Sequence, residues 1–466
     1  MTVTVGGQDV RRYFFARHAK ATVTAITTAT WQTYTKDTFP TTGNSRLVYI
    51  DGANFGPRFS PDFHRPDVFY GYEDGTFSTF NDYRQFTMRT CFHDFRNPHT
   101  RMTCYLGESV GKNLRLKISI NGIVADESMQ TIGHADPEFL SVDGPGYRNA
   151  NTEGGQPVIF TGRNFGPLGG DYIDEVLYSK DLTGMSTSPV YTAQDCQVVD
   201  AGFSAERISC LTTEGVGTDL DWQFTIARSI FTKENSTLLE AATSYGPPII
   251  SEFEGEGAFD ADTEGGERVV IKGRNFGPGT IGEVLPAFIN VSYSLRLKPS
   301  QGSNGTRAVV GFPAPANDPD AILGFRQIEF TPDDCTFDAP HTEIACYTAM
   351  GGGGNLQWEI VVDGQTSRNP FTAYDLPEVM NITEVDTGLP LLNAKTQGGT
   401  IARLLGANFG PPSDSIKEAM VNPGPLVQSV SYGPITNPEL YRLPTDAWNV
   451  VSHDIMDVEL LPGIGT

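Results

Sequence analysis

The chain lacks several features that define large classes of proteins. None of its apolar runs approaches the roughly 18 residues of a membrane-spanning helix, and its first residues show no basic-then-apolar secretion signal. We therefore expect no membrane span, and either a trimmed precursor or a part of a longer chain. Basic residues are scarce, since 33 Lys and Arg stand against 56 Asp and Glu, for a net charge of −23. This balance argues against nucleic acid as a partner, because phosphate binding requires clustered Lys and Arg.

Residue patterns typical of enzymes and metal proteins are missing as well. The seven histidines follow no shared register and make no nucleophile motif, whereas the residues that do recur are Gly, Phe, Tyr and Val, which build frameworks. The six cysteines show no CxxC or Cys/His spacing of a zinc site. Convincing helical periodicity is scarce. We predict no catalytic residues, no resident metal and no cofactor.

What the chain does contain is a six-residue motif, Gly-x-Asn-Phe-Gly-Pro, in four copies. Each copy follows an apolar, strand-like run and ends in Gly-Pro, which cannot continue a ladder, so a strand must turn there. Glycine accepts positive φ, Asn satisfies its own turn backbone, and Phe is large enough to close the end of a sandwich. A ligand contact through Asn and Phe is the alternative. The Asn-Phe pairs are Asn54 and Phe55, Asn164 and Phe165, Asn275 and Phe276, and Asn408 and Phe409.

The spacing of the motif indicates a tandem array. Successive copies are 110, 111 and 133 residues apart, each the length of one small β domain. The 50 Gly and 31 Pro residues interrupt short β-branched runs without low-complexity tracts, which is typical of all-β sandwiches. A Val-x-Tyr landmark follows each motif, at Tyr70, Tyr178, Tyr293 and Tyr432, and strand alternation places its Val and Tyr on one core-facing side.

The fold class that follows is all-β, with tandem immunoglobulin-like β-sandwiches arranged as an elongated rod. Pro137, Pro248 and Pro377 each precede an apolar run that opens the next repeat. The joints are short, so neighbouring sandwiches should form a semi-rigid rod and not a flexible string. The predicted domains are 22–136, 137–247, 248–376 and 377–466, after a terminal segment 1–21.

The cysteines occur as one pair in each of the first three repeats. The fourth repeat lacks both members together, with Trp448 at the position of the first cysteine. Joint loss is expected of a disulfide, whereas independent buried thiols are more often lost singly. Free core cysteines are the alternative. The predicted disulfides join Cys91 to Cys104, Cys196 to Cys210 and Cys335 to Cys346.

Disulfides place the chain in an oxidising compartment, so we expect an extracellular or cell-surface location. Four glycosylation sequons agree with it. Asn304 lies in the Gly- and Ser-containing insertion of the third repeat and is expected to be exposed, whereas Asn290 adjoins a strand. The predicted glycosylation sites are Asn235, Asn290, Asn304 and Asn381.

An acidic cluster crowds the entry to the third repeat. Its oxygen ligands could hold calcium at the domain junction and stiffen it. A solvated acidic linker is the simpler interpretation, and we favour it. The cluster consists of Glu252, Glu254, Glu256, Asp260, Asp262, Glu264 and Glu267.

Together, these landmarks resemble IPT/TIG domains: the Gly-Gly pairs 154–155, 265–266 and 398–399, a strand, the Gly-x-Asn-Phe-Gly motif, and a later Cys before a Gly-containing turn. The resemblance implies immunoglobulin-like sandwiches over essentially the whole chain. Repeat one departs from it with Asn44-Ser45 in place of Gly-Gly, and repeat four lacks the cysteines. The family occurs in plexin-like and other cell-surface receptors, in large extracellular proteins and in some transcription factors. An acidic chain with paired cysteines and sequons is similar to the extracellular branch, which implies binding or scaffolding.

The two ends of the chain match each other. The fourth repeat stops at a Gly-containing turn, before the strands that complete the third repeat, whereas residues 3–8 match residues 360–365. We expect residues 1–21 to be terminal strands that another copy, or another segment of a longer chain, completes. The register continues through Arg11, Phe14 and Ala16, against Arg368, Phe371 and Ala373.

A head-to-tail contact of this kind does not close on itself and so propagates as a filament. The leading function is therefore a structural subunit or segment of an extracellular filament or surface appendage, such as one of the flagellar-hair type. The alternative is a receptor or adhesion ectodomain that binds a protein or glycan ligand through its loops.

Overall fold

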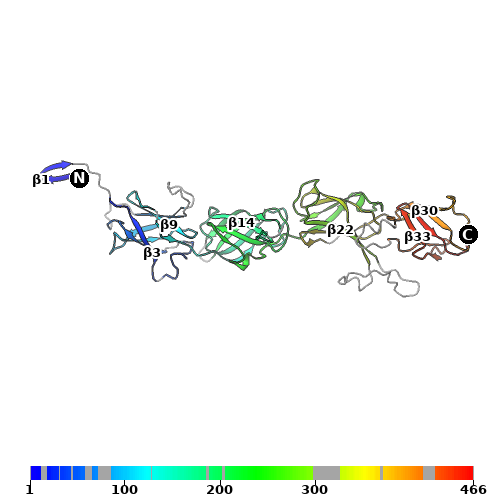
Figure 1. Cartoon of the computed structure of the whole chain (residues 1–466), viewed down its shortest axis with the longest axis horizontal. Helices are drawn as coiled ribbons and strands as arrows, with labels where there is room; N and C mark the ends of the chain where they lie inside the picture. The colour runs from blue at the N-terminus through cyan, green and yellow to red at the C-terminus, as the bar shows by residue number, and fades with distance from the viewer. Residues whose placement is uncertain are drawn as a thin grey trace. The chain divides into compact units, whose positions relative to one another are not determined.

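A computed structural model describes residues 2–11, 18–30, 32–42, 46–57, 66–71, 85–126, 128–184, 188–201, 205–297, 326–367, 371–412 and 426–464. Among these residues the regular elements are β-strands and two short 3₁₀ turns, η1 (Thr237–Leu239) and η2 (Glu256–Ala258). The strands form a succession of small antiparallel sheets, so the predicted class of tandem immunoglobulin-like sandwiches is confirmed (Figure 1).

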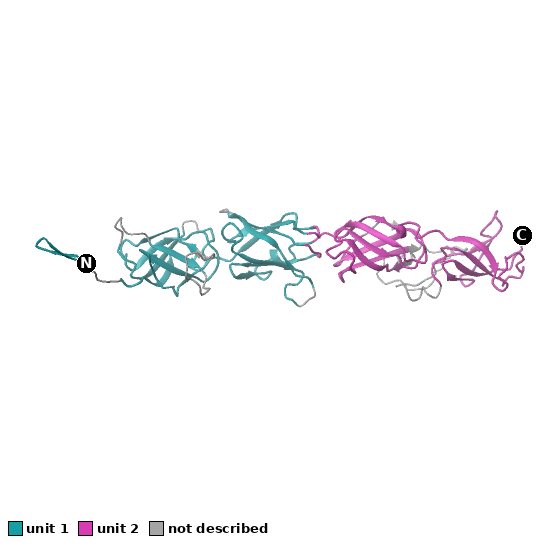
Figure 2. Ribbon diagram, turned by 90° about the horizontal axis from the view of Figure 1, so that it is seen from above, with its two compact units in different colours: residues 1–150, 154–213, 218–244 teal, residues 151–153, 214–217, 245–466 magenta. Residues whose placement is uncertain are grey.

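The chain divides into two compact units, coloured separately in Figure 2. The first holds residues 1–150, 154–213 and 218–244, and the second holds residues 151–153, 214–217 and 245–466. The four finer domain ranges remain predictions, and repeats 1 to 4 denote them below.

Repeat 1 consists of two sheets. The first sheet has the order β3-β4-β8-β7 and the second the order β10-β9-β5-β6, with β11 also paired to β9. The strands are β3 (Thr22–Thr28), β4 (Leu47–Ala53), β5 (Asp67–Gly71), β6 (Gln85–Thr87), β7 (Thr90–His93), β8 (Arg101–Tyr105), β9 (Leu114–Ile120), β10 (Ile123–Val124) and β11 (Thr131–Ile132).

Repeat 2 has the same arrangement, with sheet orders β12-β13-β17-β16 and β15-β14-β18-β19. Phe160 of the first sheet packs edge-on against Phe224 of the second at 4.9 Å, so the core lies between the two sheets. The strands are β12 (Glu138–Asp143), β13 (Pro157–Arg163), β14 (Ile173–Ser179), β15 (Tyr191–Thr192), β16 (Gln194–Ala201), β17 (Glu206–Leu211), β18 (Asp221–Ile226) and β19 (Ser229–Phe231).

Repeat 3 repeats the pattern, with sheet orders β20-β21-β25-β24 and β23-β22-β26-β27, and β28 also paired to β26. Its core is closed by Trp358 of β26, which contacts Phe253 of β20 across the sandwich at 5.4 Å. The strands are β20 (Ile249–Glu254), β21 (Arg268–Arg274), β22 (Ile289–Leu297), β23 (Arg326–Phe330), β24 (Asp333–Ala339), β25 (Glu343–Tyr347), β26 (Leu356–Val362), β27 (Gln365–Thr366) and β28 (Phe371–Thr372).

Repeat 4 departs from this pattern in its second sheet. Its first sheet is β29-β30-β34-β33, but the described part of its second sheet holds only β31 and β32. The strands are β29 (Glu378–Glu384), β30 (Ile401–Ala407), β31 (Ser431–Tyr432), β32 (Tyr441–Arg442), β33 (Trp448–Ser452) and β34 (Ile455–Glu459). A separate hairpin of β1 (Thr2–Val5) and β2 (Gln8–Arg11) precedes repeat 1.

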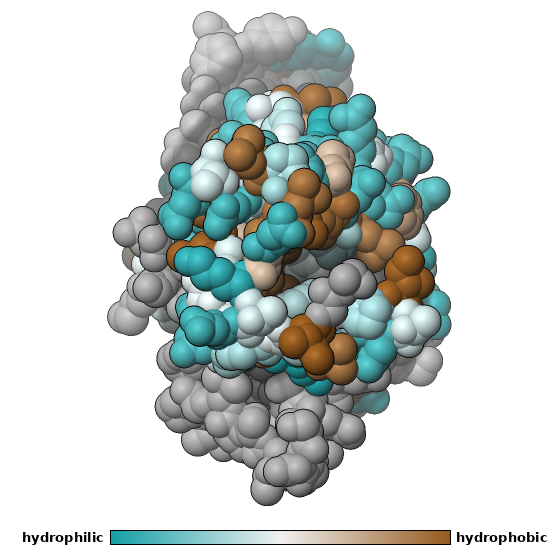
Figure 3. All heavy atoms as spheres, turned by 90° about the vertical axis from the view of Figure 1, so that its right-hand side faces the viewer, coloured by the Kyte–Doolittle hydropathy of each residue, from teal (hydrophilic) through white to brown (hydrophobic). Residues whose placement is uncertain are grey.

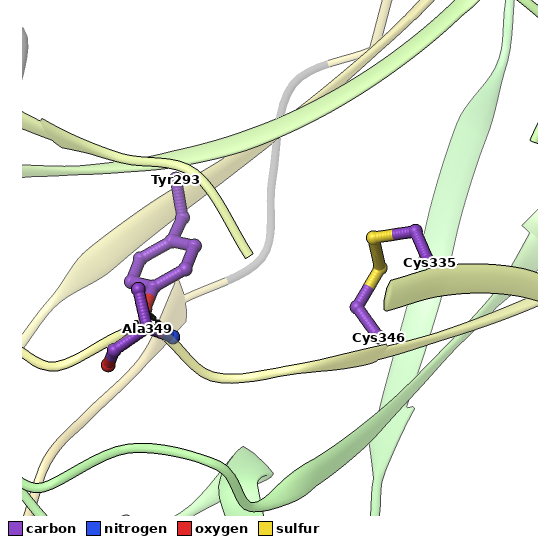
Figure 4. The surroundings of a disulfide bond; sticks show 4 residues. All are labelled: Tyr293, Cys335, Cys346 and Ala349. Carbon is purple, nitrogen blue, oxygen red and sulfur yellow. Dashed lines mark hydrogen bonds between the residues drawn. A yellow bond between two sulfur atoms is a disulfide. The ribbon is translucent and has the colours of Figure 1, made fainter. Parts of the chain in front are cut away.

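The Val-x-Tyr landmark faces the core as predicted. In the first three repeats its Val and Tyr are at most 5% exposed. The tyrosine ring stacks on the core tryptophan where there is one, as in Tyr293 on Trp358 at 4.4 Å. Its hydroxyl adds a second role, since the Tyr293 hydroxyl accepts a hydrogen bond from the N–H of Ala349, which lies three residues after Cys346 (Figure 4).

The three disulfides join the predicted pairs. Cys91 of β7 lies directly opposite Cys104 of β8, so the bond links two neighbouring strands of one sheet. In repeat 4, Trp448 lies opposite Val458 in the corresponding strands β33 and β34. An apolar pair therefore occupies the place of the disulfide there.

Candidate assembly surfaces

Each copy of the motif forms the same loop at one end of its sandwich. The Phe rings of Phe55, Phe165 and Phe276 are fully buried, and Phe409 is 6% exposed. The first glycine allows a close approach of two strands, because a Cβ at Gly162 would lie 2.0 Å from the carbonyl oxygen of Glu138 and 2.5 Å from the ring of Phe165. The loop is therefore a specific structure that other residues at this glycine would disrupt.

The motif Asn has a different partner from the one the sequence suggests. All four adopt left-handed φ angles of 60–64°, as a turn residue can. Their side chains do not satisfy their own turn, however, because each Nδ2 donates to a carbonyl of the segment that leads into its repeat. The acceptors are Lys20 O at 3.1 Å, Asp136 O at 3.2 Å, Pro247 O at 3.1 Å and Leu376 O at 3.4 Å.

A second recurring structure, here called the tip, consists of two turns of each repeat that are joined by a backbone hydrogen bond. The first turn carries a threonine, and the carbonyl of this threonine accepts the bond from an N–H of the second turn. The bonds run from Ser109 N to Thr41 O, Gly215 N to Thr152 O, Gly351 N to Thr263 O and Gly463 N to Thr396 O, at 2.9–3.1 Å. The backbone of the tip is thus shared by all four repeats.

In the first unit, the tip of repeat 1 meets the motif loop of repeat 2. Thr41 is buried and its hydroxyl donates to Glu206 Oε1 at 3.1 Å. The other carboxylate oxygen of Glu206 accepts from the N–H groups of Phe165 and Gly166 at 2.5 and 3.2 Å. Burial raises the pKa of the Glu206 carboxyl, and these three hydrogen bonds oppose the rise.

An apolar side chain completes this contact. Val110, next to Ser109 on the tip, is 3% exposed, and a Cβ added at Gly166 would lie 3.1 Å from it. The last glycine of the motif therefore leaves room for a valine. Phe86 and Tyr172 also contact each other in this unit, with ring centroids 5.0 Å apart.

The second unit contains two further contacts between a tip and a motif loop, which use other hydrogen bonds. The N–H of Thr152 donates to Asn275 Oδ1 at 3.4 Å, and that of Thr263 donates to Asn408 Oδ1 at 3.5 Å. Val216 is 2% exposed and lies 2.8 Å from the position of a Cβ at Gly277. At the third site the tip has Gly352 in place of valine, and a Cβ added at Gly410 would lie 3.7 Å from Leu426.

The expectation that the histidines follow no shared register is wrong. The carbonyls of His99, His341 and His453 each accept a hydrogen bond from the N–H of the motif Phe, at 3.1, 3.0 and 2.8 Å. The sequence contains a signal for this shared position. His99 and His341 lie five positions before the second cysteine of their repeats, and His453 lies five positions before Val458, which replaces that cysteine. Two of these rings face a tip: His341 Nδ1 lies 2.9 Å from Thr152 Oγ1, and His453 lies 3.1 and 3.6 Å from Asp262 and Glu264.

The first strand of repeat 4 is uncovered. Val379 and Ile382 of β29 are 52% and 42% exposed, whereas Ile250 and Phe253, at the same register in β20, are 7% and 5% exposed. In repeat 3 the strand β26 lies beside β22 and supplies Trp358 over Phe253. Among the described residues of repeat 4, no strand takes this place beside β31. Hydrophobic side chains are visible at the surface in Figure 3, which faces the right-hand side of Figure 1.

The β1–β2 hairpin has the geometry of the hairpin that closes repeat 3. Val5 pairs with Gln8 across the turn, as Val362 pairs with Gln365. The turn residues Gly6 and Gly7 have φ angles of 60° and 83°, close to the 47° and 83° of Asp363 and Gly364. Val3 and Val5 are nevertheless 51% and 74% exposed, while Ile360 and Val362 are buried. Of the residues aligned further on, Arg11 ends β2, and Phe14 and Ala16 lie outside the described residues.

The structure describes three of the four predicted glycosylation sites and pairs members of the acidic cluster with a lysine and a histidine. Asn235, Asn290 and Asn381 are exposed, and Asn304 lies outside the described residues, so glycosylation stays a prediction. In the acidic cluster, Glu254 pairs with Lys272 at 2.6 Å, and Asp262 and Glu264 face His453. Within the described ranges, no group of three or more His, Cys, Asp or Glu residues could hold a metal ion. The described part of the chain also contains no helix long and apolar enough to cross a membrane.

No protein-family model and no curated protein match the chain. Similar solved structures include a protein with a xylogluco-oligosaccharide, at 11% identity and a TM-score of 0.27, covering 96% of each chain. The plexin A4 extracellular region is 10% identical over 90% of this chain and 33% of its own, with a TM-score of 0.19. The Escherichia coli adhesin FdeC is 12% identical over 77% of this chain and 100% of its own, with a TM-score of 0.21. At these scores the likeness carries no argument about function.

Proposed function

We propose that the protein is a structural subunit or segment of an extracellular filament or surface appendage, in which the β1–β2 hairpin of one copy completes repeat 4 of the next. The observation that carries this proposal is the uncovered face of repeat 4. Exposed Val379 and Ile382 form the kind of apolar surface that the second sheet covers in the other repeats. Its occupant is an added strand, because β31 keeps an open ladder edge among the described residues.

The hairpin matches this place in chemistry and register. If Val3 and Val5 take the positions of Ile360 and Val362, both valines enter the core and Thr2 and Thr4 point outward. Burying the two valines and covering Val379 and Ile382 would each remove apolar surface from water, at about 25 cal/mol per Å². The added strand would also satisfy the edge of β31.

Several features support an extracellular, non-catalytic role. Three disulfides are stable only in an oxidising compartment. The acidic composition favours solubility, and the sequons are of the secreted type. The recurring residues build loops and cores, so we assign the protein to structural and binding proteins and not to enzymes.

The hairpin variant Val3→Asp tests the proposal. It should raise the dissociation constant of self-association by about tenfold or more, because a carboxylate would have to enter the core. Thr2→Asp is the matched control, since that position faces outward, and should associate like the wild type. Sedimentation velocity over a concentration series measures the effect.

A fusion gives a positive test. Appending a second copy of residues 1–20 after residue 466 should supply the strand within one chain, stabilise repeat 4 and stop polymer growth. An intact protein that stays monomeric while repeat 4 is as stable as repeat 3 would contradict the proposal and favour a receptor or adhesion ectodomain.

A further inference from the structure

The tip and the motif loop each occur four times, but one copy of each has no partner among the described residues. The threonines of the first three tips, Thr41, Thr152 and Thr263, are each 1% exposed, whereas Thr396 of repeat 4 is exposed. The last glycine of the motif is buried in repeats 2 to 4, at Gly166, Gly277 and Gly410, whereas its counterpart Gly56 in repeat 1 is only partly buried. A Cβ added at Gly56 would meet no described atom within 4 Å.

The apolar side chain of the tip is likewise buried in repeats 1 and 2, where the tip has a partner, and exposed in repeat 4. Val110 and Val216 are 3% and 2% exposed against Gly166 and Gly277. Ile464 is the corresponding residue of repeat 4, since it follows Gly463 as Val110 follows Ser109, and it is 82% exposed. Its backbone is held in place, because its N–H donates to the Tyr441 hydroxyl at 3.0 Å and its carbonyl accepts from the same hydroxyl at 2.9 Å.

We propose that the tip of repeat 4 docks on the motif loop of repeat 1 of a second copy, with Ile464 seated over Gly56 and the N–H of Thr396 donating to Asn54 Oδ1. The partner is a copy of this chain because both halves of the contact already have the backbone of the contacts made inside it. The Thr396 carbonyl accepts from Gly463 N at 3.0 Å, as at the other tips, and the His99 carbonyl accepts from Phe55 N at 3.1 Å, as at two other loops.

One feature of the internal contacts would not be reproduced. Asp262 and Glu264, which face His453, are replaced in the tip of repeat 4 by Lys395 and Gln397. The new contact therefore depends on the isoleucine and the Thr–Asn hydrogen bond and not on an ion pair with His99. Together with the exchanged hairpin, this contact would fix the position of one copy relative to the next.

This inference rests on the proposed head-to-tail assembly, and a variant outside the hairpin separates the two. Ile464→Asp in the full chain should raise the dissociation constant of self-association by about tenfold or more, since burying an isoleucine supplies that much affinity. The matched control is Ile435→Asp, because Ile435 is 100% exposed on the same repeat and has no counterpart in the other tips. It should associate like the wild type.

The outcomes are distinguishable. If Val3→Asp abolishes assembly but Ile464→Asp associates like the wild type, the tip contact is wrong and the strand exchange stands. If Ile464→Asp weakens assembly and Val3→Asp does not, the tip contact stands and the strand exchange is wrong. If neither variant has an effect, both are overturned.

A crosslink supplies a direct readout. A photoreactive benzoylphenylalanine at position 464 of the full chain should crosslink, in the assembled protein, to peptides of another copy that contain residues 54–57 or 97–100. Peptide mapping by mass spectrometry identifies them. Crosslinks confined to other repeats would overturn the tip contact.

Discussion

At the scale of single residues, polar side chains inside the sandwiches are joined in short chains. In repeat 1 the Tyr70 hydroxyl lies 2.7 Å from Ser109 Oγ, which lies 2.8 Å from His134 Nε2. His134 Nδ1 lies 3.2 Å from the carbonyl oxygen of Phe39. Since a carbonyl can only accept, Nδ1 carries a proton. Burial lowers the pKa of the ring and keeps it neutral, so Nε2 accepts from the Ser109 hydroxyl. The ring thus helps to fix the turn that carries Val110.

Burial lowers the pKa of His134 from 6.5 to about 4. Above pH 6.5 the imidazole is neutral in both folded and unfolded chains, so it adds no pH dependence. As the pH falls from 6.5 to 4, the unfolded chain binds a proton that the folded chain does not. The free energy of unfolding of repeat 1 should fall by up to about 3 kcal/mol over this window.

The measurement is the urea midpoint for exchange of the β9 amides, followed by mass spectrometry at several pH values. His134→Gln should flatten the dependence between pH 6.5 and 4, although it lowers stability at pH 7. His99→Gln, an exposed position, is the control and should keep the wild-type slope. An unchanged slope in His134→Gln would contradict the assignment.

At the scale of elements, the same pair of strands is joined by a disulfide in three repeats and by packing in the fourth. Cys91 and Cys104 are direct cross-strand partners, and Trp448 and Val458 are partners at the same place. Val458 is 4% exposed within the core of repeat 4, where Trp448 packs against it. Both the disulfide and the Trp448–Val458 pair hold the outer strand of the sheet against its neighbour.

The register predicts that a fourth disulfide can be built. The double variant Trp448→Cys and Val458→Cys should oxidise without rearrangement, because the two positions face each other as Cys91 and Cys104 do. Crosslinking a loop of this length contributes about 2–3 kcal/mol, which should offset part of the packing lost with tryptophan. Thiol titration and intact mass measure the bond, with Val458→Cys alone as the control. Two free thiols in the oxidised, folded protein would show that the strands have another register.

At the scale of the whole molecule, the repeats differ in how completely they are built. The buried cluster of repeat 3 includes Trp358, Tyr293 and Phe253 from both sheets. Among the described residues of repeat 4, the buried cluster consists of Ala402, Phe409, Leu443, Val450, Met456 and Val458. Because stability follows the apolar surface removed from water, repeat 4 without its added strand should be the least stable part.

Hydrogen exchange can check this order. In dilute solution the amides of β29 and β30 should exchange faster than those of β20 and β21, which occupy the same places in repeat 3. At concentrations where the protein associates, or with the fused hairpin, protection of β29 and β30 should rise towards that of repeat 3. Equal protection of both repeats in the monomer would contradict the incomplete sandwich.

The all-β sandwich class, the cysteine pairs and the core-facing side of the Val-x-Tyr landmark were readable from the sequence. These features depend on local patterns: period-two alternation, turn residues that end strands, and cysteines that appear and disappear together. Repetition strengthened each signal, because one interpretation had to fit several copies.

Only the tertiary structure decided what the loops do. It joined each motif Asn to a linker carbonyl, placed His99, His341 and His453 at one position, and seated Val110 over Gly166. These contacts join turns that are distant in sequence, and a glycine required by a neighbour's side chain looks in the sequence like any turn glycine. The five-residue spacing from histidine to cysteine was visible, but its meaning depends on which carbonyl the buried N–H of the motif Phe reaches.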